Sequence, residues 1–187
     1  MIVKRNGARR VESAEVVYAD EGIVTVDSAS IAALIRDAAH NPRRRIRLCT
    51  HSNVEDAVHE MLIVHERSCY VRPHKHIGKS ESFHVIEGEV DVVILDDLGN
   101  VTDVISMGPY GSDRSFFYRI AEPLYHTLLI RSEVLVFHET TSGPFQRDQT
   151  VFASWSPDGE EADEVASYLS VLNTTIARML PSEERRV

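Results

Sequence analysis

The sequence is poor in cysteine and has no long apolar run. Cys49 and Cys69 are the two cysteines among 187 residues. They lack C-x-x-C spacing, so we expect free thiols in a reducing compartment. No apolar stretch approaches the roughly 18 residues of a membrane helix, and the opening MIVKRNGARR lacks the apolar core of about 7–15 residues found in signal peptides. These absences predict a cytoplasmic protein with no membrane partner.

Basic charge is also scarce relative to acidic charge. The chain has 20 Lys and Arg residues against 29 Asp and Glu, a formal net charge of −9. Such a chain repels phosphate polymers on average, so we expect no nucleic-acid partner. A chain of this length, 43% apolar and 26% charged, can bury about 70% of its unfolded surface. It therefore needs neither a disulfide nor a metal merely to fold.

Short apolar segments separated by turn residues dominate the middle of the chain, from about residue 57 to 139. They are rich in Val, Ile, Phe and Tyr, recur about every ten residues, and predict an antiparallel sandwich or barrel. Residues 96–100 read as a hairpin loop. The predicted strands include 61–64, 70–76, 83–86, 90–95, 101–105, 116–120, 125–130 and 134–137.

Helices are predicted on both sides of this β-rich segment. The first spans about Ser30 to His40, with Ser28 or Ser30 as N-cap and Pro42 ending it. The second spans about 157–180, with Ser156 as N-cap. Its apolar stripe is expected to pack on the barrel or on a second subunit. We divide the chain into an extension at 1–27, with short strands at 16–18 and 23–26, and one domain at 28–187.

The segment 74–88 has the residue types of a metal site. In a strand, His74 and His76 point to the same side. A turn at Gly78 can bring Glu81 back toward them on the next strand. Imidazole nitrogens with a carboxylate oxygen form a normal ligand set for a divalent transition metal. The alternative is that the histidines are hydrogen-bonded core residues without a metal.

The chain resembles the cupin superfamily at this point. The first cupin motif has a glycine, His-x-His, Glu and a second Gly, which match at His74, His76, Glu81 and Gly88. Ser68 stands at the position of the opening glycine. Of the second cupin motif only His126 remains, because Ala121, Pro123 and Ile130 replace its Pro, Gly and Asn.

A closer similarity, over residues 28–172, is to the WbuC family of cupin-fold metalloproteins. It is carried by N-P-R-R-R at 41–45 with His51, Y-V-R-P-H-K-H at 70–76, V-F-H-E at 136–139, G-P-F at 143–145 and W-S-P at 155–157. The resemblance implies a double-stranded β-helix, or jelly-roll barrel, with flanking N-terminal and C-terminal helices. It also implies one divalent metal held by His74, His76, Glu81 and His126. The activity of that family is undefined, and its gene neighbourhoods suggest sugar or sugar-nucleotide chemistry in surface-polysaccharide metabolism.

Other residues are candidates for a substrate pocket. The run Arg43, Arg44, Arg45 and Arg47 is either a solvated segment or the mouth of a site for a carboxylate or phosphate. Arg72 shares the parity of His74, and Phe83 that of Glu81. His51 joins the pocket candidates through the family pattern. Glu139 is a candidate general base or a hydrogen-bond partner of a ligand histidine, or else an exposed polar residue.

The sequence thus predicts a metal-binding cupin that acts on a small polar or anionic metabolite. Isomerisation, epimerisation or dioxygenation are compatible reactions, and Fe, Mn, Ni, Co or Zn are compatible metals. A non-catalytic sensor module and a metal-independent sugar-nucleotide isomerase are the alternatives. We expect a homodimer, because an isologous pair is the commonest assembly.

Overall fold

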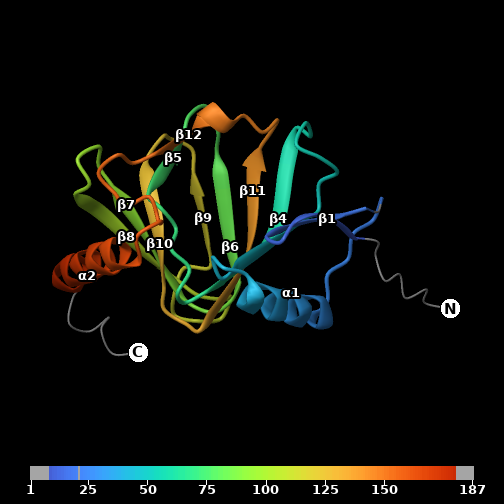
Figure 1. The fold of residues 1–187 in the computed structure, drawn as a ribbon, viewed down its shortest axis with the longest axis horizontal. Helices are drawn as coiled ribbons and strands as arrows, with labels where there is room; N and C mark the ends of the chain where they lie inside the picture. Colours follow the sequence, from blue (N-terminus) through green and yellow to red (C-terminus); the bar gives the residue numbers. More distant parts are fainter. Residues whose placement is uncertain (1–8, 21, 180–187) are drawn as a thin grey trace.

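The computed structural model describes residues 9–20 and 22–179. Its centre is a barrel of two facing sheets (Figure 1), built from eight strands. In one sheet the strands run in the order β4-β11-β6-β9, and in the other β5-β10-β7-β8. This nested pairing, in which the first strand of the eight lies beside the last, is that of a jelly roll. The predicted fold class, an all-β double-stranded β-helix with flanking helices, is confirmed. The eight strands are β4 (Val58–Glu66), β5 (His74–His76), β6 (Glu81–Glu87), β7 (Val90–Leu95), β8 (Val101–Met107), β9 (Phe117–Ile120), β10 (Tyr125–Ile130) and β11 (Val134–Ser142).

Both sheets extend beyond the eight strands. β1 (Arg9–Ser13), β2 (Val16–Ala19) and β3 (Arg45–Cys49) continue the first sheet past β4, and β12 (Thr150–Phe152) pairs with β5 after a 3-10 turn at Arg147–Gln149. The sequence analysis missed β1, β3 and β12, and its predicted strand at 23–26 is wrong. That segment is irregular because it leads into a helix, and Val26 packs against the apolar cluster beneath that helix.

Helix α1 (Ser28–His40) covers the outer face of β3 and β4 (Figure 1). It begins earlier than predicted because Asp27 is the N-cap, accepting a hydrogen bond from the Ser30 amide at 2.8 Å. Leu34 and Ala38 are fully buried against the outward apolar residues of the sheet. Helix α1 thereby leaves the inner face of β3 free for other side chains.

Helix α2 (Ala162–Met179) lies on the outer face of the five-stranded sheet, near β7 and β8 in Figure 1. Its predicted start near residue 157 is wrong. Ser156 does not cap it, because its hydroxyl donates to the Ala153 carbonyl, while the Pro157 carbonyl accepts from Tyr70. Leu172 and Ile176 pack on the barrel wall, one of the two expected partners, and the predicted end at residue 180 lies outside the described residues.

Within the described part of the chain, neither helix is long and apolar enough to cross a membrane. The division of the chain at residue 27 stays a prediction.

Candidate metal centre

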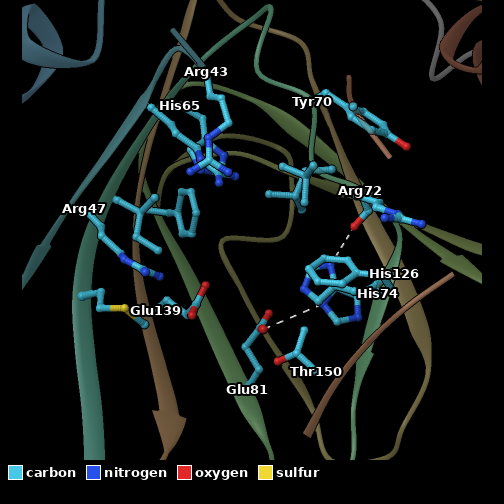
Figure 2. Close-up of a pocket in the computed structure, with 18 of the residues that line it drawn as sticks. Arg43, Arg47, His65, Tyr70, Arg72, His74, Glu81, His126, Glu139 and Thr150 are labelled. Atoms are coloured by element: carbon cyan, nitrogen blue, oxygen red, sulfur yellow. Dashed lines mark hydrogen bonds and ion pairs between the residues drawn. The ribbon is translucent and has the colours of Figure 1, made fainter. Parts of the chain in front are cut away.

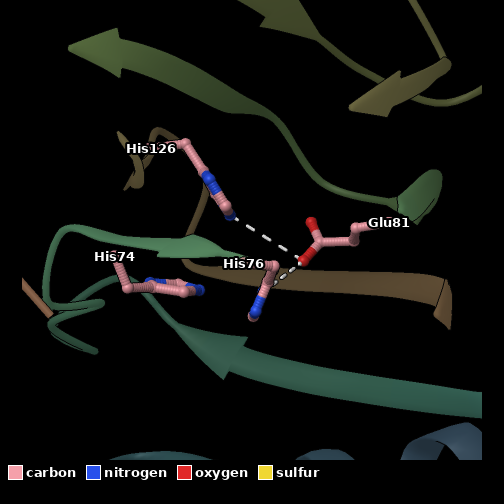
Figure 3. Close-up of side chains that lie close together, drawn as sticks. All are labelled: His74, His76, Glu81 and His126. Carbon is pink, nitrogen blue, oxygen red and sulfur yellow. Dashed lines mark hydrogen bonds and ion pairs between the residues drawn. The ribbon is translucent and has the colours of Figure 1, made fainter. Parts of the chain in front are cut away.

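Three elements bring the four predicted ligands together. His74 and His76 lie on β5, Glu81 begins β6, and His126 lies on β10 directly opposite His74 in the strand register. Their ligand atoms all lie within 4.8 Å of one another. Figure 3 shows the three imidazoles and the carboxylate converging on one point.

Hydrogen bonds orient all three imidazoles. His74 Nδ1 lies 2.8 Å from the Arg72 carbonyl, and His126 Nδ1 lies 3.0 Å from the Leu124 carbonyl. His76 Nδ1 lies 3.2 Å from the Thr150 hydroxyl of β12. A ring whose Nδ1–H is donated to a carbonyl presents the Nε2 lone pair at its other end, as ligand histidines do. The Nε2 atoms of His74 and His126 are thus left for the shared point, and His76 Nε2 faces the Glu81 carboxylate.

A tyrosine orients the carboxylate. The buried Tyr118 of β9 donates its hydroxyl hydrogen to Glu81 Oε1 at 2.7 Å. Glu81 Oε2 then lies 3.1 Å from His76 Nε2 and 3.8 Å from His126 Nε2. One carboxylate oxygen is therefore occupied by the protein and the other faces the histidines.

Two of the four candidate ligands, Glu81 and His74, have the protonation state of a metal ligand. Burial alone would raise the pKa of Glu81, but contacts with His126 and His76 outweigh it and hold that pKa well below its ordinary range. Burial and the neighbouring His126 lower the pKa of His74 to about 3. An ionised carboxylate beside a neutral imidazole is the protonation state that metal ligation requires.

The donor set fits a divalent transition metal. Three imidazole nitrogens and one carboxylate oxygen suit Fe, Mn, Ni, Co or Zn. Because the protein offers four ligands, a metal that takes five or six would keep positions for water or substrate. The four residues would hold the ion directly, and Tyr118 and Thr150 would orient two of them.

The cluster lies on the wall of a cavity of about 1040 Å³ between the two sheets (Figure 2). The apolar core, which includes Phe83, Val85 and Phe137, fills the rest of the interior. A cavity of this size can enclose a small metabolite.

Glu139 faces this cavity from β11. Strand pairing sets it between Met61 of β4 and Phe83 of β6, on the inner face of the sheet. Burial and the nearby Glu81 carboxylate raise the pKa of Glu139 to about 8. The next residue back, His138, points to the other face, toward Glu60.

The predicted pocket residues all line the cavity, but they have different partners there. Arg43 and Arg45 both bind the Glu15 carboxylate, and the His51 ring stacks on His59 at 4.2 Å. Phe83 is 1% exposed and stacks on Phe137, so it belongs to the floor of the cavity.

Arg72 contacts the His/Glu cluster through its backbone. Its guanidinium donates to the Ala153 carbonyl and lies over the Phe152 ring, while its own carbonyl faces His74.

Sequence reasoning missed the site roles of Tyr118 and Thr150, and it named Arg47 only as one member of the arginine run. The alternation Arg45-Ile46-Arg47-Leu48 is a strand signal, and it could have placed both arginines on one face. No local signal marks Tyr118 or Thr150, because their partners lie 37 and 74 residues away.

Comparison with known proteins gives a partial match. The family model of a domain of unknown function, DUF6016, matches residues 26–107, which include His74, His76 and Glu81 but not His126. No curated protein matches the chain.

Solved structures of low sequence identity resemble it. A protein from Shewanella oneidensis is 7% identical with a TM-score of 0.47, over 66% of this chain and 77% of its own. The cupin domain of Cnp3 from Schizosaccharomyces pombe is 11% identical, with a TM-score of 0.42, over 53% of this chain and 64% of its own. A variant of oxalate decarboxylase from Bacillus subtilis is 17% identical, with a TM-score of 0.43, over 63% and 29%.

The chain thus spans less than two thirds of the length of the last two structures. Its own strand order is that of a cupin barrel.

Proposed function

We propose that this protein is an enzyme that binds one divalent transition metal through His74, His76, Glu81 and His126 and acts on a small polar metabolite. One observation carries the proposal. Four ligand-capable side chains, each already oriented by a hydrogen bond or ion pair, converge on the wall of an open cavity. A purely structural metal would need no such space beside it.

The residues of the chain have separate tasks in this proposal. When bound, the metal supplies a Lewis acid that polarises a substrate oxygen. Glu139 faces the same cavity, so its carboxyl group can hold or transfer a proton of a bound substrate. The apolar floor around Phe83 and Phe137 excludes water from that side.

We also infer kinship with the WbuC family, and with it a sugar-related substrate. The support is that the family-like segments at 41–45, 70–76 and 136–139 all contribute residues to one cavity. A cytoplasmic location and a homodimer remain part of the proposal, on the composition and on the frequency of paired assemblies.

The metal is tested by elemental analysis of the purified protein beside His74→Ala and His84→Ala. His84 is the matched control, because it lies on β6 with its side chain exposed and outside the cluster. We expect about one metal per chain in the wild type and in His84→Ala, and a large loss in His74→Ala. Stoichiometric metal in His74→Ala would remove that residue from the site.

Catalysis is tested by screening the metal-loaded protein against sugars, sugar phosphates and small organic acids. We expect turnover that a chelator abolishes and that Glu139→Gln strongly reduces while metal content is kept. Tight metal binding without turnover would favour the sensor module. Full activity after chelation would favour the metal-independent isomerase.

A further inference from the structure

The cavity wall formed by β3 and β4 is basic. Arg45 pairs with His65 across these strands and Arg47 pairs with Ile63, so both arginines share the inner face with His65. Ile46 and Leu48 point the other way, into the apolar cluster under α1. Figure 2 shows Arg43, Arg47 and His65 on the side of the cavity opposite His74 and His126.

The positive charge of this wall is only partly balanced. Glu15 binds two guanidiniums at once, with contacts of 2.6 and 2.7 Å to Arg43 and 3.0 Å to Arg45. Arg47 forms no ion pair within residues 9–20 and 22–179. Three arginines thus share one carboxylate. Because a guanidinium is charged at all physiological pH values, the surplus positive charge is permanent.

A buried polar atom on the same wall lacks a partner. His65 is 8% exposed, and its Nδ1 has no hydrogen-bond partner among the described residues. Burial and the Arg45 charge, with a smaller effect of Arg47, lower the pKa of His65 to about 3, so its ring is neutral at neutral pH. A buried unsatisfied nitrogen is costly and indicates a missing partner, such as a ligand or an ordered water.

We propose that Arg45, Arg47 and His65 form a subsite for the phosphate or carboxylate group of the small molecule whose other end lies at the His/Glu cluster. This inference deepens the proposed function. It rests on that function only for the contact between the other end of the molecule and the metal at the His/Glu cluster. The planar fork of arginine matches both kinds of oxyanion with paired hydrogen bonds. The Glu15 carboxylate holds Arg45 in place for this contact.

The strand order limits the size of the molecule. β3 and β6 are separated by β4 and β11, which gives three strand spacings, or about 14 Å across the sheet, and the register places Glu81 four residues along the strands from the level of Arg47, roughly another 13 Å. The arginine and glutamate side chains shorten the remaining gap. The anionic group therefore lies at the far end of the molecule from the oxygen that reaches the cluster, as in an extended phosphorylated or carboxylated compound.

Anion binding is tested on metal-free protein at low salt, by titrating inorganic phosphate in one arm and succinate in the other. Line broadening in ³¹P and ¹H NMR reports binding even when it is weak. We expect saturable binding of at least one probe and roughly tenfold or greater weakening in Arg47→Gln. Arg119→Gln is the control, because Arg119 is an exposed arginine of β9 that does not line the cavity.

Arg47→Lys is a second variant in case Arg47→Gln does not fold, because it keeps the positive charge and loses only the paired N–H donors of the guanidinium. We expect it to bind the probe with intermediate affinity. The probe that binds more tightly, inorganic phosphate or succinate, identifies the bound group as a phosphate or a carboxylate. Wild-type affinity in Arg47→Gln, or binding of neither probe by the wild type, would overturn the subsite. Failure of the wild type to bind metal would instead overturn the proposed function. The titration of metal-free protein would still measure anion binding at the subsite.

Discussion

At the scale of single residues, Tyr118 determines how Glu81 presents its carboxylate. The phenol donates to Oε1, and both side chains are buried, so water cannot easily replace the bond. With Oε1 occupied, Oε2 is the oxygen directed at the histidines. Glu81 is therefore prepared to act as a ligand through one oxygen.

We predict that Tyr118→Phe weakens metal binding by about 10–100-fold, the usual effect of removing a partner that orients a ligand. The ring and its stacking on Phe83 at 5.2 Å are kept, so the fold should survive. Competition with a chromogenic chelator measures the affinity. Tyr110→Phe is the control, since Tyr110 is 83% exposed, and equal affinities in both variants would contradict the role of Tyr118.

His65 makes a separate prediction about acid stability. Its folded pKa of about 3 lies below the ordinary value of 6.5, so the unfolded chain binds a proton that the folded chain does not. The stabilisation is complete above pH 6.5 and is lost as pH falls toward 3, by about 1.4 kcal/mol per unit at most.

We therefore expect His65→Gln to lose less stability than the wild type between pH 7 and pH 5. Urea unfolding at the two pH values measures the difference. An identical loss in both proteins would show that the buried ring does not contribute to acid sensitivity.

At the scale of elements, Gly88 sets the turn between β6 and β7. Its φ is +88°, and a Cβ there would lie 2.1 Å from the Val134 carbonyl oxygen. Gly111 has a nearly equal φ of +90° but open space around it. A substitution at Gly111 therefore tests backbone strain alone, whereas a substitution at Gly88 tests backbone strain together with a steric clash.

We predict that Gly111→Ala destabilises the protein by about 1–2 kcal/mol, the cost of left-handed backbone for a residue with a Cβ. Gly88→Ala should cost roughly 1–3 kcal/mol more, because β11 must also move. Urea unfolding of the two variants gives the comparison. Equal losses would mean that the turn adapts to the added methyl group.

At the scale of the whole molecule, the His/Glu cluster joins the two sheets. Glu81 belongs to the seven-stranded sheet, and the three histidines belong to the five-stranded sheet. An ion held by all four would connect the sheets across the barrel interior. Unfolding must break this connection, so metal binding and folding are linked.

We predict that saturating metal raises the free energy of unfolding, by about 4 kcal/mol when free metal is 1,000 times the Kd. Thermal unfolding with and without a chelator measures the shift, and His74→Ala should show little of it. A chelator that leaves the wild-type transition unchanged would argue against an ion between the sheets.

The sequence by itself determined the features that depend on neighbouring residues. Strand alternation places His74 and His76 on one face and puts His138 and Glu139 on opposite faces, while the structure shows that Glu139 is the one that faces inward. The turn residues at 96–100 correctly predicted the hairpin between β7 and β8. These features follow from local backbone geometry, so the sequence of a single segment is enough to predict them.

Only the tertiary structure decided which distant segments meet. The pairing of His126 with His74, the bond from Tyr118 to Glu81 and the binding of Arg43 and Arg45 by Glu15 all join residues far apart in the chain. Arg43, Arg44 and Arg47 are exposed, as the solvated alternative expects, and only the pairing of β3 with β4 places Arg45 and Arg47 on one face of the sheet. Contacts of this kind arise from strand register across the barrel, and the local sequence does not encode that register.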